Sequence, residues 1–305
     1  MNKQKLLANL ALLTAALVWG FAFVQQEQAA KYVGSFTVNA LRSIVAVVAL
    51  FPLIVFTSKK SKRPILEKTK EDRKLLFKAG TMCGVLLCIS ANLQQFGISL
   101  YPESAATSAR SGFITALYVV LVPICGLLFK RKVSPVVFVS VIVATLGLYL
   151  LCGSKGMSGI YLGDVVVLCC ALCFSFQILC VDYFIDRVDG IKLSAIQFLV
   201  CGILSLVLMF IFERPSIENI LLSAKFILYL GVVSSGVGYT LQIIGQKYSD
   251  NPTVASIIMS LESVFAAIGG WLFMHKSLSF VEILGCIIMF SAIILAQLPN
   301  KSKAK

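Results

Sequence analysis

Residues that serve enzyme active sites are scarce in this sequence. Only one of its 305 residues is histidine, His275, so a histidine-based metal centre cannot be assembled. No Gly-Lys dipeptide occurs, which excludes a P-loop and ATP hydrolysis through one. Glu262 is the only acidic residue well inside an apolar segment, so the paired carboxylates of an intramembrane protease are missing as well. We therefore predict a protein that is not an enzyme and that binds no metal ion or cofactor.

Charged residues are also few, at 13% of the chain, against 58% hydrophobic residues and a mean hydropathy of +0.91. Such values are typical of integral membrane proteins. A helix crosses the hydrocarbon layer with about 20 apolar residues, because lipid offers the backbone no other hydrogen-bond partner. Such segments lie near residues 7–26, 36–57, 76–98, 104–129, 134–152, 163–185, 193–212, 225–246, 253–274 and 280–298. The predicted fold class is an all-α polytopic membrane protein with ten transmembrane helices.

The net charge of +13 follows the predicted topology. With both termini in the cytoplasm, 20 of the 27 basic residues fall on the cytoplasmic side, five fall outside, and Arg42 and Arg110 fall inside predicted helices. This bias is what the positive-inside rule predicts for an even number of helices. We therefore predict a multi-pass protein of the cell (cytoplasmic) membrane that contacts the lipid bilayer and has no nucleic-acid partner.

The ten cysteines lie within or at the edge of the predicted helices, where disulfides are not expected. Cys170 and Cys173 form a Cys-x-x-Cys motif, which also occurs in metal and redox sites. We interpret these thiols instead as small polarizable side chains that fill helix contacts.

The two halves of the chain resemble each other in three segments. The longest match joins LYVVLVPICGLLFKRK (117–132) to LESVFAAIGGWLFMHK (261–276), with seven identities in sixteen residues at an offset of 144. Shorter matches join LQQFG (93–97) to LQIIG (241–245), and ALVWGF (16–21) to ALCFSF (171–176). The chain is therefore predicted to contain an internal repeat.

The predicted repeats are residues 1–152 and 153–305, each with five helices. Because five is odd, the second repeat must enter the membrane from the opposite side. Many secondary transporters use this inverted arrangement around a central cavity.

Several segments carry a resemblance to a known family. They are WGFAF (19–23), LRSIVAVVAL (41–50), LQQFG (93–97), GFITALYVVLVP (112–123) and LESVFAAIGGWLF (261–273), in this order along the two repeats. The chain resembles a ten-helix permease of the drug/metabolite transporter superfamily, EamA-like family, over essentially its whole length. The resemblance implies a metabolite or drug permease, with export of amino acids or related compounds as the favoured direction.

Arg110 lies about seven residues into the fourth predicted helix, beside a stripe of hydroxyl-bearing residues. At 100° per residue, this stripe contains Ser104, Thr107, Ser108, Ser111, Thr115 and Tyr118. A hydroxyl-lined face suits water or a solute, so we predict that Arg110, Ser111, Thr115 and Tyr118 bind the substrate. Two hypotheses are open for Arg110, because an arginine is costly in lipid: it binds or gates the substrate, or it is a structural ion pair or surface anchor.

Glu262 lies nine residues into the ninth predicted helix, near the middle of the membrane. Its helical face carries mostly small residues, which leave room for close helix packing or for a cavity. Ionisable groups at this depth often carry protons through transporters, so Glu262 is the candidate for proton coupling. The alternative is a neutral carboxyl group hydrogen-bonded between helices. The sequence also leaves open a salt bridge between Glu262 and Arg110.

Uncharged polar and aromatic side chains complete the predicted substrate site. The further candidates are Trp19, Asn92, Gln95, Tyr239 and Gln242. The repeat pairs Gln94 with Gln242. Such groups suit small polar ligands, but interhelical hydrogen bonds explain them equally well. Arg42, near the outer part of the second helix, is interpreted as an interface or interhelical anchor.

We predict a secondary transporter that moves a small-molecule solute, such as an amino acid or a drug-like compound, across the cytoplasmic membrane by alternating access. An exchanger of phosphorylated sugars or nucleotide-sugars is the nearest alternative, and it would need several basic residues in the cavity. A non-transporting scaffold or membrane enzyme would need an appended domain or a catalytic cluster, and neither is visible in the sequence. A homodimer is also left open.

Overall fold

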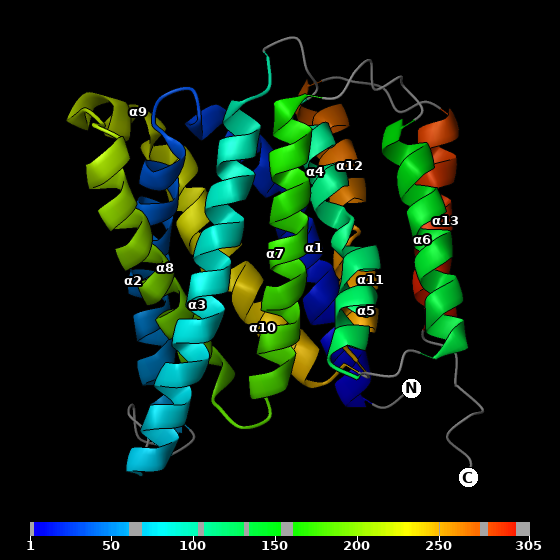
Figure 1. The fold of residues 1–305 in the computed structure, drawn as a ribbon, viewed down its shortest axis with the longest axis horizontal. Helices are drawn as coiled ribbons and strands as arrows, with labels where there is room; N and C mark the ends of the chain where they lie inside the picture. Colours follow the sequence, from blue (N-terminus) through cyan, green and yellow to red (C-terminus); the bar gives the residue numbers. More distant parts are fainter. Residues whose placement is uncertain are drawn as a thin grey trace.

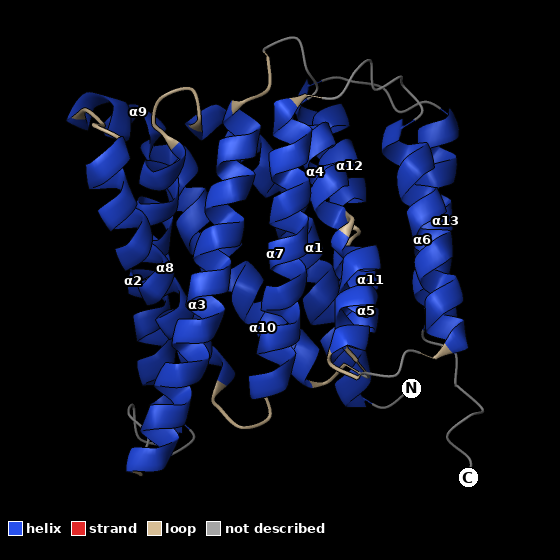
Figure 2. Cartoon of the chain, in the orientation of Figure 1, coloured by secondary structure: helices blue, strands red, loops and turns tan. Residues whose placement is uncertain are grey.

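The computed structural model describes residues 3–60, 69–102, 107–130, 134–153, 161–249, 251–274 and 280–296. Its regular elements are all helical, and no strand occurs in these ranges (Figure 2). The helices are α1 (Lys3–Ala29), α2 (Ser35–Lys60), α3 (Lys70–Ser99), α4 (Thr107–Ala116), α5 (Tyr118–Leu128), α6 (Pro135–Gly153), α7 (Leu162–Phe184), α8 (Gly190–Phe212), α9 (Ile217–Leu228), the π-helix η1 (Tyr229–Gly238), α10 (Tyr239–Lys247), α11 (Pro252–Met259), α12 (Glu262–Met274) and α13 (Phe280–Ala296). Of the residues singled out in the sequence, Ser104 and His275 lie outside the described ranges.

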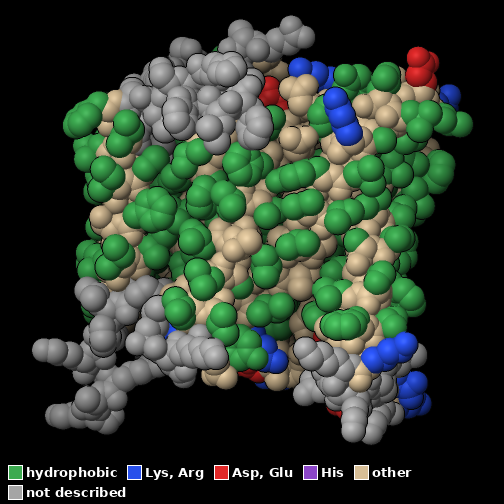
Figure 3. Space-filling model, turned by 180° about the vertical axis from the view of Figure 1, so that it is seen from behind, with side chains coloured by type: hydrophobic (Ala, Val, Ile, Leu, Met, Phe, Trp, Pro, Cys, Tyr) green, Lys and Arg blue, Asp and Glu red, His purple; other side chains and the backbone are tan. Residues whose placement is uncertain are grey.

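These elements form ten crossings of the bundle. Eight helical segments are long and apolar enough to cross a membrane, and α6 and α13 supply two shorter apolar ones. One crossing is built from α4 and α5, one from α9, η1 and α10, and one from α11 and α12. Hydrophobic side chains cover the middle of the surface, and most charged side chains in view lie near its two ends (Figure 3). The predicted ten-helix membrane fold is confirmed.

The two repeats run in opposite directions through the bundle. The first repeat begins with α1, which rises from the face where both termini lie, and the second begins with α7, which runs the other way (Figure 1). Helices of different repeats pack together: α3 contacts α7 and α8, α2 contacts α8, and α1 contacts α12. The helices α6 and α13 pair with each other at one edge. The core therefore lies between two inverted repeats.

Three crossings differ from the continuous α-helices that the sequence predicts. The fourth and ninth crossings are interrupted, and the eighth contains the ten-residue π-helix η1. Hydrophobic composition does not reveal these irregularities, because an interrupted apolar helix has the same residue types as a continuous one. The ninth crossing begins with a capped turn: the side chain of Asn251 accepts a hydrogen bond from the amide of Val254, and Pro252 is the first helical residue.

Helices α1 and α12 approach each other closely at Gly20. A Cβ atom at this position would lie 2.6 Å from Cβ of Phe265 and 2.8 Å from backbone atoms of Ala266 and Glu262. Such distances are shorter than van der Waals contact, so glycine is required for this packing. At Gly112 of α4, by contrast, the nearest atom to such a Cβ would be a ring carbon of Phe23 at 3.5 Å.

We expect Gly20→Ala to lower the free energy of unfolding by about 1–3 kcal/mol, because α12 must move away from α1. Gly112→Ala is the matched control, since it gains helix propensity without a clash and should be neutral or stabilising by up to about 1 kcal/mol. Unfolding titrations in mixed detergent micelles measure both variants. Equal destabilisation by the two would contradict the close approach at Gly20.

Candidate functional site

Two transmembrane crossings are interrupted at equivalent positions of the repeats. The fourth breaks at Leu117, between α4 and α5, and the ninth breaks at residues 260–261, between α11 and α12. The longest repeat match aligns Leu117 with Leu261. The amide of Leu117 donates to the carbonyl of Ile114, and the amide of Leu261 donates to the carbonyl of Ile258. Both bonds span three residues, as in a tightened helical turn. Interrupted helices at corresponding places in two halves typically mark a binding site in membrane proteins.

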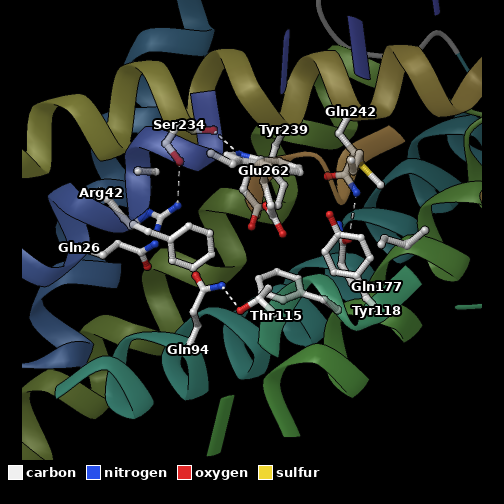
Figure 4. A pocket seen from close by; sticks show the side chains of 16 residues that line it. Gln26, Arg42, Gln94, Thr115, Tyr118, Gln177, Ser234, Tyr239, Gln242 and Glu262 are labelled. Atoms are coloured by element: carbon white, nitrogen blue, oxygen red, sulfur yellow. Dashed lines mark hydrogen bonds between the residues drawn. The ribbon is translucent and has the colours of Figure 1, made fainter. Parts of the chain in front are cut away.

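Each break brings the first residue of the next helix to the wall of one cavity. These residues are Tyr118 and Glu262, which are 4% and 3% exposed. The lining consists of Trp19, Ala22, Phe23, Gln26, Arg42, Gln94, Thr115, Tyr118, Phe174, Gln177, Ile178, Ser234, Tyr239, Gln242, Met259 and Glu262 (Figure 4). The space of about 40 Å³ has room for about three water molecules. It is too small for most organic solutes.

The repeat relates most of the lining residues to one another. The aligned pairs are Trp19 and Phe174, Ala22 and Gln177, Phe23 and Ile178, Gln94 and Gln242, Thr115 and Met259, and Tyr118 and Glu262. The cavity therefore lies on the pseudo-two-fold axis between the repeats. The paired side chains differ in chemistry: the second repeat has Met259 at the position equivalent to Thr115 of the first. The two repeats therefore contribute different chemical groups to the cavity.

Aromatic rings form one wall of the cavity. The ring centroids of Trp19 and Tyr239 lie 4.8 Å apart, and Phe198 supports Tyr239 at a centroid distance of 5.2 Å. The indole Nε1 of Trp19 donates to the carbonyl of Ser234 in η1 at 3.2 Å. Gly238 permits this approach, because a Cβ there would lie 2.7 Å from Nε1. The wall offers a solute a fixed apolar surface.

Amide and hydroxyl groups line much of the remaining surface. Gln94 Nε2 donates to Thr115 Oγ1 at 3.2 Å, and Gln242 Nε2 donates to Gln177 Oε1 at 3.4 Å (Figure 4). Cavity oxygens without a hydrogen-bond partner in the described structure are Gln26 Oε1, Tyr118 Oη, Gln242 Oε1 and Glu262 Oε1. Buried polar atoms are normally hydrogen-bonded, so these oxygens suit donors of a solute or of water.

Arg42 of α2 also reaches the cavity. Its side chain donates through Nε to Ser235 Oγ at 3.0 Å and through Nη2 to Ser234 Oγ at 3.5 Å, and both serines belong to η1. Only 5% of the residue is exposed. The interpretation of Arg42 as an interhelical anchor accounts for these two bonds, but it did not place the guanidinium in the cavity wall.

Arg110 is not among the residues that line this cavity. Its guanidinium forms two 2.5 Å bonds with the carboxylate of Asp164, joining the start of α4 to the start of α7. The ring centroid of Tyr161 lies 4.6 Å from the guanidinium carbon. Tyr101 donates to the same carboxylate at 2.8 Å, and burial together with this carboxylate raises the pKa of Tyr101, which keeps it a donor. Of the two hypotheses for Arg110, the structure shows the ion pair, with Asp164 rather than Glu262 as the partner.

The other predicted binding residues divide into two groups. Those in the lining are Trp19, Thr115, Tyr118, Tyr239, Gln242 and the proton-coupling candidate Glu262. Outside it, Asn92 Nδ2 donates to Ser205 Oγ of α8 at 2.9 Å, and Gln95 Nε2 donates to the carbonyl of Gln26 at 3.0 Å. Ser111 is buried in α4, also outside the lining. For Asn92 and Gln95, the structure shows the interhelical bonds that the sequence left as an alternative.

A model of the EamA-like transporter family matches residues 6–153 and again residues 161–298. The chain belongs to the EamA-like transporter family. Two relatives from Archaeoglobus fulgidus, both named as uncharacterized transporters, are 27% and 26% identical to it over 296 and 298 residues. These matches cover 97% and 94% of the chain, and 87% and 96% of the relatives.

A solved crystal structure has a TM-score of 0.73 to this EamA-like chain, covers 95% of it and 98% of its own length, and is 17% identical. It therefore shares the fold. Membership of the EamA-like family makes the chain a multi-pass membrane transporter and not an enzyme. The family predicted from the sequence is confirmed.

We expect Arg110→Ala and Asp164→Ala each to destabilise the protein, because either removes the ion pair between these two largely buried side chains. The double variant should lose less than the sum of the two, with a coupling of about 1–3 kcal/mol. Unfolding titrations in mixed detergent micelles measure this cycle. A parallel cycle between Arg110 and Glu262 is the control and should be additive, so coupling there would speak against Asp164 as the partner.

Proposed function

We propose that this EamA-like transporter moves a small organic solute across the cell membrane by alternating access, and that the solute binds in the cavity between the repeats. The observation that carries the proposal is the pair of equivalent helix breaks, which deliver Tyr118 and Glu262 to the same cavity. Irregular backbone at membrane depth is tolerated where protein buries it or where it lines a cavity. Exchange of conformation between inverted repeats opens such a site to one face and then to the other.

An amino acid or a related metabolite fits the lining well. The rings of Trp19 and Tyr239 offer surface to an apolar side chain, and the amides and hydroxyls offer partners to polar groups. A phosphorylated sugar or nucleotide-sugar, which the sequence left as an alternative, is less well matched. Its phosphate groups call for several basic residues, and the lining contains one, Arg42.

The proposed orientation places both termini in the cytoplasm. Support comes from the charge distribution: in this orientation, 20 of the 27 basic residues fall in cytoplasmic segments. Nine of these lie between Lys59 and Lys78, around the connection from α2 to α3. Export is the direction that the resemblance to exporters of amino acids favours.

A counterflow screen in proteoliposomes tests the proposed function. We expect exchange of at least one amino acid or related metabolite from a panel that also contains sugars, nucleobases and cationic drugs. Trp19→Ala should reduce this exchange at least tenfold, because it removes ring surface from the cavity wall. Absence of counterflow for every class in the panel would contradict a transport role for the cavity.

Glu262 is the proposed proton carrier, since it is the one acidic side chain of the lining. Glu262→Gln keeps the size and the hydrogen-bonding capacity of the side chain but removes its titration. We expect this variant to fold and to exchange solute, while the pH dependence of uptake disappears. Glu218→Gln, at an exposed position in the first turn of α9, is the control and should keep the wild-type pH profile. An unchanged profile for Glu262→Gln would exclude Glu262 as the carrier.

A further inference from the structure

The charge of Arg42 is not neutralised by an acidic neighbour. Its hydrogen-bond partners are the uncharged hydroxyls of Ser234 and Ser235, and none of the described carboxylates forms an ion pair with it. Even Glu262, in the same cavity wall, is not within ion-pair distance. Arginine stays charged when buried, and a buried charge normally lies against an opposite one. The site is therefore suited to an anion.

The hydroxyls of Ser234 and Ser235 use only some of the N–H donors of the Arg42 guanidinium. Of its five N–H groups, one on Nε and one on Nη2 donate to Ser235 and Ser234. Both serines lie on η1, so they hold Arg42 from one side. The remaining N–H groups on Nη1 and Nη2 can form the two parallel bonds by which arginine binds a carboxylate.

The side of the cavity away from Arg42 presents hydrogen-bond acceptors rather than a positive charge. Figure 4 shows Arg42 at one side of the cavity, and Tyr118 and Gln242 at the other. Oε1 of Gln242 and Oε1 of Glu262 have no partner in the described structure, and each can accept a hydrogen bond. A solute that satisfies both sides carries an acceptor-only anionic group at one end and N–H donors at the other.

The second repeat lacks this charge. Five residues separate α1 from α2, and five separate α7 from α8, so the helices can be aligned by their ends. Arg42 is the eighth residue of α2, and Gln197 is the eighth residue of α8. Gln197 accepts a bond from Gln177 and carries no charge. The positive charge is therefore present in the first repeat and absent at the equivalent position of the second, and Arg42→Gln gives the first repeat the side chain that the second already holds.

We propose that Arg42 binds a carboxylate of the transported solute and thereby selects carboxylic acids that carry N–H donors elsewhere in the molecule. The inference rests on the proposed transport function and assigns its substrate class. The aromatic wall at Trp19 and Tyr239 then contacts the body of the solute between its two polar ends.

Counterflow with matched pairs of solutes tests the role of Arg42 in the full-length protein in proteoliposomes. The pairs are amino acids with their carboxamides and monocarboxylic acids with their amides, together with phosphate monoesters. We expect the wild-type protein to prefer each transported acid over its amide by about 10- to 100-fold, the range for bonds between charged groups. Arg42→Gln should abolish this preference, and Arg42→Lys should keep part of it, because lysine retains the charge without the planar fork.

Arg187→Gln is the matched control, because it removes the same charge at an exposed position in the turn after α7 and should leave the preference unchanged. Preference of the wild type for amides or phosphate monoesters, or an acid preference retained by Arg42→Gln, would overturn the role of Arg42 while transport itself stands. Counterflow of no solute would reject the transport function and this inference together.

A second variant keeps the test decisive if Arg42→Gln does not fold. Replacing Ser234 and Ser235 by alanine leaves the charge but removes the two acceptors that position it. We expect a higher KM for acids, with little change in KM for any transported amide. An unchanged KM for acids would count against the proposal.

Discussion

Lipid offers a peptide group nothing to bond with, so each backbone amide in the bundle must find its partner within the protein. Regular α-helices meet this constraint along most of the described chain. The exceptions are the break at Leu117, the break at residues 260–261, and η1, and all three contribute side chains next to them to one cavity. At η1, the indole Nε1 of Trp19 donates a hydrogen bond to the backbone carbonyl of Ser234. In the described crossings, irregular backbone therefore lies beside the cavity, where protein groups can satisfy it.

The duplication of the five-helix repeat explains the position of the cavity, and the sequence differences between the two repeats explain its chemistry. Inverted repeats place equivalent residues around a common axis, so Trp19 and its counterpart Phe174 line the same cavity, as do Tyr118 and Glu262. Equivalent positions of the two repeats therefore share a similar backbone arrangement. Their side chains differ, because a hydroxyl in one repeat stands where a carboxyl stands in the other. The lining is thus symmetric in the placement of its residues and asymmetric in their chemistry.

The number of helices and the inversion of the repeats could be predicted. The length of the apolar segments and the odd number of helices in each repeat can both be read from the sequence. Periodicity also placed Thr115 and Tyr118 on one helical face, and both residues line the cavity. The role of Arg110 could not be predicted, because its partner Asp164 lies 54 positions away and only the packing of α4 on α7 joins them. Arg42 was interpreted as an anchor rather than as a binding residue, because a buried arginine has the same sequence signature whether it faces a helix or a solute. Phe174 was not among the predicted site residues, although the match of ALVWGF to ALCFSF pairs it with Trp19, and both residues line the cavity.

The pair between Arg110 and Asp164 links the first repeat to the second, at the face opposite the two termini. Both side chains are about nine-tenths buried, with relative exposures of 10%. Dissolved ions screen such a pair far less than they screen charges on the surface. The link between the repeats at that face is consequently less sensitive to ionic strength than an ion pair on the surface would be.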